Sequence, residues 1–138
     1  SSDVCSSDLA NIFLEDIYIY KKIKQHFNDT YVRPHRHIKK DETFHIIRGE
    51  LKVVIFNDDG SIMEIIEMGE FGTRKVFFYR MSKSLYHTVI PVSEIVVFHE
   101  TTEGPFSLED IKYPGWAPDG SSIKETKGFL FQLFSSFV

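Results

Sequence analysis

The chain has 138 residues, of which 42% are hydrophobic and 26% charged, as is typical of one globular domain. Its formal net charge of −4 argues against nucleic acid as a partner, because no basic tract stands out. No apolar run approaches the roughly 18 to 20 residues that a membrane-spanning helix needs. We therefore expect neither a nucleic-acid nor a membrane partner.

The first nine residues, SSDVCSSDL, repeat Ser-Ser-Asp and contain the only cysteine, Cys5. They lack the basic start and apolar core of a signal peptide, and they resemble the translation of a sequencing-adapter read. We therefore interpret residues 1–9 as a non-native segment. Without Cys5 the chain has no thiol, which excludes disulfides and thiolate metal sites and makes a cytoplasmic location the expectation.

Short stretches with apolar alternation, separated by turn signals, predict strands along most of the chain. Much of 12–27 is expected to be a strand, with a short helix before Asp16 as the alternative. Pro34 should make the next strand an edge strand or bend it, because proline cannot donate to a sheet. Turns are expected at 28–30, 57–60 and 69–72, and further strands over 31–37, 42–48, 50–56, 61–68, 75–80, 85–91 and 94–101.

Strands with turns every eight to twelve residues are typical of an all-β barrel or sandwich. We expect this barrel to occupy residues 10–104. Residues 105–138 differ, because they begin with a segment rich in Pro and Gly and end with apolar residues. This C-terminal tail is expected to wrap irregularly over the barrel, with Trp116 packed on the core and a final short helix or strand covering an opening.

Three histidines and a glutamate gather within a short stretch that includes His35, His37 and Glu42. Side chains two apart on a strand share a face, so His35 and His37 can converge on one ion. The gap to Glu42 lets the chain turn and bring a carboxylate beside them, and Gly49 suits a tight turn. Imidazoles with a carboxylate favour a divalent first-row metal ion.

The spacing His35-x-His37, four residues, Glu42, six residues, Gly49 resembles the first motif of the cupin superfamily. The segments YVRPHRHIKKDETFHIIRGELKVVIFNDDG, LYHTVIP, VVFHETTEGPF and GWAP resemble, in the same order, the WbuC family of cupin-fold metalloproteins. This resemblance implies a double-stranded β-helix, a jelly-roll barrel with a divalent ion (Fe, Mn, Ni or Zn) inside. The ligands that it implies are His35, His37, Glu42 and His87.

Two positions of the second cupin motif depart from the usual pattern. Ser82-Lys83-Ser84 stands where Pro-x-Gly is usual, and Pro91 stands where an asparagine is usual. The WbuC family often occurs near genes for surface polysaccharide synthesis, which implies a metal-dependent enzyme acting on a small, oxygen-rich, sugar-like substrate. Two alternatives remain: a metal-independent sugar-nucleotide ketoisomerase or epimerase, and a non-catalytic cupin that senses a small ligand.

Other residues are candidates for roles beside the metal. Arg33 should share the face of His35, where it would bind an anionic substrate group or pair with Glu100; both interpretations stay open. Tyr31 would line the same pocket or belong to the core. Tyr86 and Glu100 are the candidates for proton transfer, whereas His45 should face away from the site. The aromatic tail is compatible with a homodimer.

Overall fold

The computed structural model of the chain describes residues 13–21, 31–82, 84–103 and 107–137. The N-terminal segment 1–9 and the turn expected at 28–30 lie outside these residues, and so does the expected boundary between barrel and tail at residue 104. Within them, no helix is long and apolar enough to cross a membrane.

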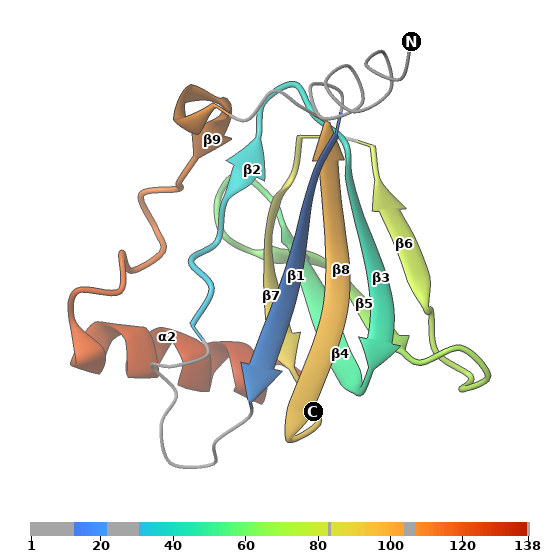
Figure 1. The fold of residues 1–138 in the computed structure, drawn as a ribbon. Helices are drawn as coiled ribbons and strands as arrows, with labels where there is room; N and C mark the ends of the chain where they lie inside the picture. Colours follow the sequence, from blue (N-terminus) through green and yellow to red (C-terminus); the bar gives the residue numbers. More distant parts are fainter. Residues whose placement is uncertain (1–12, 22–30, 83, 104–106, 138) are drawn as a thin grey trace, which may run out of the picture.

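Antiparallel strands account for most of the regular structure, and one α-helix, α2, is described near the C-terminus. The predicted all-β fold class is therefore confirmed (Figure 1). The strands are β1 (Phe13–Lys21), β2 (Arg36–His37), β3 (Glu42–Arg48), β4 (Glu50–Phe56), β5 (Ile62–Gly69), β6 (Phe78–Met81), β7 (Tyr86–Pro91), β8 (Ile95–Glu103) and β9 (Ile111–Lys112). The helices are the 3-10 helix η2 (Leu108–Asp110) and α2 (Ile123–Ser135).

Two sheets enclose the main core. One has the strand order β1-β8-β3-β6 and the other β5-β4-β7, while β2 pairs with β9 beside them (Figure 1). Burying apolar side chains between two sheets removes their surface from water and is the main stabilising contribution. The buried residues of this core are Phe44, Ile46, Leu51, Val53, Ile55, Met68, Met81, Val89, Val96 and Phe98.

The sequence patterns of β3 and β4 follow from what covers each face. On β3, buried Phe44 and Ile46 alternate with exposed His45 and Ile47, so one face meets the core. On β4, both faces are buried, because α2 packs on the face that looks away from the barrel core. Val54, Phe56 and Ile90 there contact Leu133 and the aromatic residues Phe129, Phe134 and Trp116.

Several boundaries differ from those expected. The strand expected over 31–37 is reduced to β2 and a bridge at His35, because Pro34 interrupts the regular backbone. The strand expected over 75–80 begins only at Phe78. Residues 13–15 belong to β1, so the alternative of a helix before Asp16 is wrong there. Before α2 the tail contains the short η2 and β9 and is otherwise irregular, and α2 covers the outer face of a sheet and not an opening.

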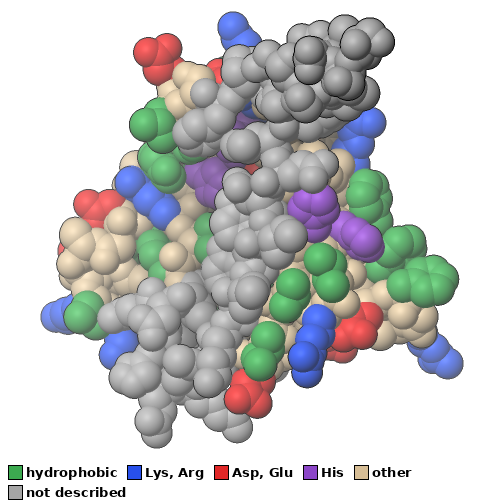
Figure 2. Space-filling view, viewed as in Figure 1, with side chains coloured by type: hydrophobic (Ala, Val, Ile, Leu, Met, Phe, Trp, Pro, Cys, Tyr) green, Lys and Arg blue, Asp and Glu red, His purple; other side chains and the backbone are tan. Residues whose placement is uncertain are grey.

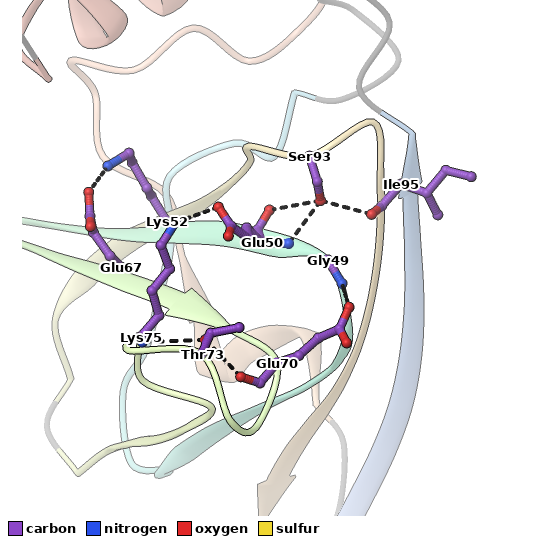
Figure 3. Close-up of polar contacts among 9 residues, drawn as sticks. All are labelled: Gly49, Glu50, Lys52, Glu67, Glu70, Thr73, Lys75, Ser93 and Ile95. Carbon is purple, nitrogen blue, oxygen red and sulfur yellow. Dashed lines mark hydrogen bonds and ion pairs between the residues drawn. The ribbon is translucent and has the colours of Figure 1, made fainter.

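The turn between β3 and β4 explains Gly49, the last residue of the histidine-rich motif. Gly49 has a φ of 84°, and a Cβ built there would lie 2.3 Å from the carbonyl oxygen of Ile95. Its N–H donates to Glu70 Oε1 at 2.8 Å, and the next N–H, of Glu50, donates to Ser93 Oγ at 2.8 Å (Figure 3). Gly49 is therefore explained by the close approach of β8, which fixes where β3 ends.

Hydrophobic side chains are exposed on the side of the molecule where β3 and β6 lie, next to histidine side chains (Figure 2). His45 is exposed there, with its ring centroid 6.2 Å from those of Phe77 and Phe78. It faces away from the core, as the alternation on β3 predicts. In the tail, Phe131 is exposed on α2. The homodimer expected from the aromatic tail stays a prediction.

Candidate metal centre

A backbone bridge places His35 and His87 side by side. The N–H of His35 donates to the carbonyl oxygen of His87 at 3.0 Å, and the N–H of His87 donates to that of His35 at 2.9 Å. Directly opposed residues of an antiparallel pair have neighbouring side chains, and the two ring centroids are 4.7 Å apart. Two residues far apart in the sequence thus present imidazoles to one point.

Glu42, the first residue of β3, lies between the imidazoles. Its Oε2 is 3.0 Å from Nε2 of His87, and its Oε1 is 3.0 Å from Nε2 of His37. The side chain is 1% exposed, so its charge is offset by these two imidazole contacts, neither of which has the geometry of a well-formed hydrogen bond. A buried carboxylate without hydrogen bonds is costly, and a cation held between these atoms would remove that cost.

Two histidines are oriented by hydrogen bonds to the backbone. His35 Nδ1 lies 2.9 Å from the carbonyl oxygen of Arg33, and His87 Nδ1 lies 3.1 Å from that of Leu85. A carbonyl oxygen only accepts, so each Nδ1 carries the proton and each Nε2 keeps its lone pair in the neutral ring. Fixing one ring nitrogen in this way prepares the other for a metal.

The four residues expected to bind the metal are not equivalent in the structure. Donor atoms of His35, Glu42 and His87 all lie within 4.8 Å of one another. His37 is outside this group and contacts the carboxylate from the other side. The residues present therefore fit a divalent ion through three donors, and the role of His37 as a fourth ligand stays a prediction.

Burial and charge act in opposite directions on these groups. Burial alone would raise the pKa of Glu42, but the nearby His87 and His37 outweigh it and hold that pKa well below its usual range. Burial and the neighbouring His87 lower the pKa of His35 to about 4. Burial disfavours the charged form of His87, but attraction to Glu42 prevails and raises its pKa.

The lowered pKa of His35 predicts how metal-free protein responds to pH. In the unfolded chain the imidazole titrates near 6.5, the ordinary pKa of a solvated histidine. Between pH 6.5 and 4 the unfolded chain therefore takes up a proton that the folded chain does not. The free energy of unfolding, measured in chelator by denaturant titration, should fall over this window by up to about 3 kcal/mol.

His87 acts above that window, and Glu42 acts only at its acidic end and below it. The raised pKa of His87 contributes stability that is present below pH 6.5 and lost above it, and the lowered pKa of Glu42 contributes stability that is lost below about pH 4.5. A His35→Asn variant should flatten the profile between pH 6.5 and 4, whereas His45→Asn, at an exposed position, should keep it. A flat wild-type profile would contradict the assignment.

The two candidates for substrate binding lie beside the tail. The Cζ atom of Arg33 lies 4.5 Å from the ring centroid of Tyr113, and no described residue forms an ion pair with Arg33. The alternative of an ion pair with Glu100 is therefore not supported. Tyr31 donates its hydroxyl hydrogen to the carbonyl oxygen of Pro118 at 2.6 Å and packs on Phe129. Burial raises the pKa of Tyr31 to about 12.

The two candidates for proton transfer occupy different faces. Tyr86 precedes His87 on β7 and contacts Arg36 and Trp116, which lie on the side covered by the tail. Glu100 pairs in register with Phe44 and follows buried Phe98 by two residues, so it shares the inner face of its sheet. For Glu100 this placement favours a role near the metal centre, whereas the contacts of Tyr86 are those of a packing residue.

Two neighbours of the histidines were not expected from the sequence. Tyr113 lies with its ring centroid 6.3 Å from that of His35, and Phe44 lies 5.9 Å from that of His87. Phe44 was recognisable only as a core residue of its strand. Tyr113 precedes Pro114 in the irregular tail, where no periodicity indicates its position. It reaches the site because Arg36 pairs with Lys112 and His37 with Ile111 in the β2–β9 ladder.

A family model described as a domain of unknown function (DUF6016) matches residues 23–68, which is less than half of the chain. The search of curated proteins found no match. Among solved structures, protein SO0799 from Shewanella oneidensis is 11% identical with a TM-score of 0.56, over 74% of this chain and 61% of that chain.

Two similar structures are oxalate decarboxylases. The enzyme from Bacillus subtilis, studied for its Mn(II) centres, is 18% identical with a TM-score of 0.55, over 77% of this chain and 25% of its own. The formate complex of the Lactobacillus farciminis enzyme is 15% identical with a TM-score of 0.55, over 77% of this chain and 28% of its own. The chain thus spans only about a quarter of these enzymes. At such low identity the likeness shows the fold alone, and the fold of this chain is that of the cupins.

Proposed function

We propose that this chain is a metal-dependent cupin that acts on a small, oxygen-rich, sugar-like molecule. The observation that carries the proposal is the buried carboxylate of Glu42, which has an imidazole nitrogen 3.0 Å from each oxygen without a well-formed hydrogen bond and converges with donor atoms of His35 and His87. Such an arrangement is favourable when a cation occupies it. The Mn(II) centres of the similar oxalate decarboxylase support a divalent ion, without identifying it.

A divalent ion at this centre would act as a Lewis acid that polarises an oxygen atom of the bound molecule. The protein's own groups would prepare that step. His35 and His87 are held by backbone carbonyl oxygens, so they need no reorientation when the ligand binds. The apolar side chains of the barrel, including Phe44, exclude water from the inner side of the site. Glu100, on the inner face of its strand, is the proposed proton carrier.

The sugar-like substrate and the link to surface polysaccharide synthesis come from the resemblance of the quoted segments to the WbuC family. That resemblance supports a place in this family. The small carboxylate named in a similar structure, the formate of the Lactobacillus farciminis enzyme, is another oxygen-rich molecule. Both point to a ligand that binds through oxygen atoms.

Elemental analysis of untagged protein, expressed in bacterial cytoplasm without added metal, tests the metal. We expect about one equivalent of Fe, Mn, Ni or Zn per chain. The His87→Ala variant should lose it, because His87 is one of the three convergent donors. His37→Ala separates three-donor from four-donor binding, since a partial loss would show that His37 also contributes.

The matched control is His45→Ala, which removes an exposed histidine on the outer face and should leave the metal content unchanged. Wild-type protein that stays folded and empty after Fe(II), Mn(II), Ni(II) and Zn(II) are offered would overturn the proposal. His35 and His37 would then be candidates for acid–base work without metal, as in the ketoisomerase alternative.

A further inference from the structure

Arg33 is a half-buried cation whose guanidinium lacks an acceptor within the described part of the chain. Its Nε is buried and has no hydrogen-bond partner among the residues that the structure describes. The guanidinium contacts the ring of Tyr113, at 4.5 Å from Cζ to the centroid, and its charge also helps to lower the pKa of Asp119 without forming an ion pair with it. A cation–π contact leaves the N–H groups in the plane of the guanidinium unsatisfied. A buried N–H group without an acceptor is unfavourable, and an anion bound to the guanidinium would remove that cost.

A pocket of about 470 Å³ opens beside this guanidinium. The polar residues that line it with Arg33 are Asp119, Ser121 and Glu125, and Trp116 forms part of its wall. This volume falls in the range of sites for small molecules. The pocket belongs to the tail and not to the barrel interior, so it is separate from the three convergent metal donors.

Two contacts nonetheless connect the pocket with the metal centre. The carbonyl oxygen of Arg33 accepts the hydrogen bond that orients His35. The ring of Tyr113 also contacts both residues, since it lies against the guanidinium of Arg33 and its centroid is 6.3 Å from that of His35. One molecule could therefore be held by Arg33 at one end and reach toward the metal centre at the other.

The lining of the pocket restricts the class of ligand. A guanidinium recognises a carboxylate or a phosphate through two parallel hydrogen bonds. Asp119 and Glu125 add negative charge to the same pocket, which disfavours a dianion. Their oxygens, and the hydroxyl of Ser121, instead suit the hydroxyl groups of a neutral carbon chain or ring.

We propose that Arg33 and this tail pocket bind the carboxylate end of a small polyhydroxylated acid, of the sugar-acid class. This proposal rests on the proposed function only for the reaction at the metal. Arg33 is not one of the expected metal ligands, so binding of the acid to Arg33 does not require the metal. Binding at the pocket should therefore be measurable in metal-free protein. In this proposal Arg33 is a specificity-determining residue, and Tyr113 is the residue that positions Arg33.

The chain has one tryptophan, Trp116, and it lines the pocket. Tryptophan fluorescence therefore reports on this pocket, and calorimetry measures the affinity. We expect D-glucuronate to change the fluorescence of wild-type protein, in chelator as well as with metal. D-glucose, which lacks the carboxylate, and glucose 6-phosphate, which is more highly charged, should bind more weakly.

Arg33→Gln should weaken glucuronate binding by roughly 10- to 100-fold, and Arg33→Lys should fall between this variant and wild type. The control Arg80→Gln, at an exposed arginine paired with Asp41, should bind like wild type. A melting curve of each variant checks folding, and if Arg33→Gln does not fold, Arg33→Lys carries the comparison.

Three results would overturn the inference. The first is that glucuronate does not change the fluorescence of Trp116, either with or without metal. The second is that the Arg33→Gln variant binds glucuronate as tightly as wild type. The third is that glucose 6-phosphate binds more tightly than glucuronate. A protein that binds glucuronate through Arg33 but takes up no metal would refute the proposed function and leave this inference intact. A protein that binds metal but not glucuronate would refute this inference and leave the proposed function intact.

Discussion

Replacing Glu42 by Gln should lower the affinity for a divalent ion by at least about 100-fold, because even groups that only support metal ligands change affinity by 10- to 100-fold. The substitution keeps the shape of the side chain and removes the charge between Nε2 of His37 and Nε2 of His87. Competition with a chromophoric chelator, with Zn(II) and Mn(II) as the probes, measures the change.

The same variant should also lower the pKa of His87, since attraction to the carboxylate is what raises it. NMR titration of the imidazole in metal-free protein would show this. Glu67→Gln is the matched control, because Glu67 is an exposed carboxylate that pairs with Lys52 outside the site. Equal metal affinity in wild type, Glu42→Gln and Glu67→Gln would refute a role for Glu42 as a ligand.

Replacing Phe44 by Ala should lower the free energy of unfolding by about 3–5 kcal/mol, the range for deleting a buried aromatic ring. Phe44 is fully buried in the main core, with its ring centroid 6.3 Å from that of Phe98 and 5.9 Å from that of His87. The cavity would lie directly behind the metal centre. Denaturant titration in chelator measures the loss without the stabilisation that bound metal adds.

The matched control removes an exposed phenylalanine. Phe131 on α2 is 74% exposed, so Phe131→Ala should change the free energy of unfolding by no more than about 0.5 kcal/mol. Since the ring of Phe44 also supports His87, the Phe44→Ala variant should bind metal more weakly than wild type. A loss of stability no larger than that of Phe131→Ala would show that the core is not packed around this ring.

Strands of this fold were predictable wherever a turn signal and an alternating pattern coincided. The turn at 57–60 was expected from Asn-Asp-Asp-Gly, and Gly60 there has a φ of 89°. Prediction was weaker where tertiary contacts decide the backbone. Phe77 looked like a strand residue, but β6 begins only at Phe78, where pairing with His45 of β3 starts. Strand propensity alone cannot place such a boundary.

His35 and His37 could be proposed as metal donors from the two-residue period of a strand, and the resemblance to the cupin motifs added Glu42 and His87 to the expected set. The segment between His35 and Glu42 is short, but it does not join paired strands, because β2 pairs with β9 whereas β3 pairs with β8 and β6. The difference between His37 and the other donors could not be proposed, because alternation places His35 and His37 on one face without saying how far each reaches. The structure brings His35 to His87 through a backbone bridge, and His37 is paired instead with Ile111 of the tail.

The all-β class and the pairing of His35 with His37 on one strand face were readable from local periodicity, whereas His87 was proposed only through the resemblance to cupin motifs. Only the tertiary structure decided the surroundings of the metal ion. Tyr113 and the pocket beside Arg33 come from a tail without periodicity, and they reach the site through the β2–β9 pairing and the packing of α2. Contacts between segments so far apart depend on how the whole chain packs, and no local pattern encodes them.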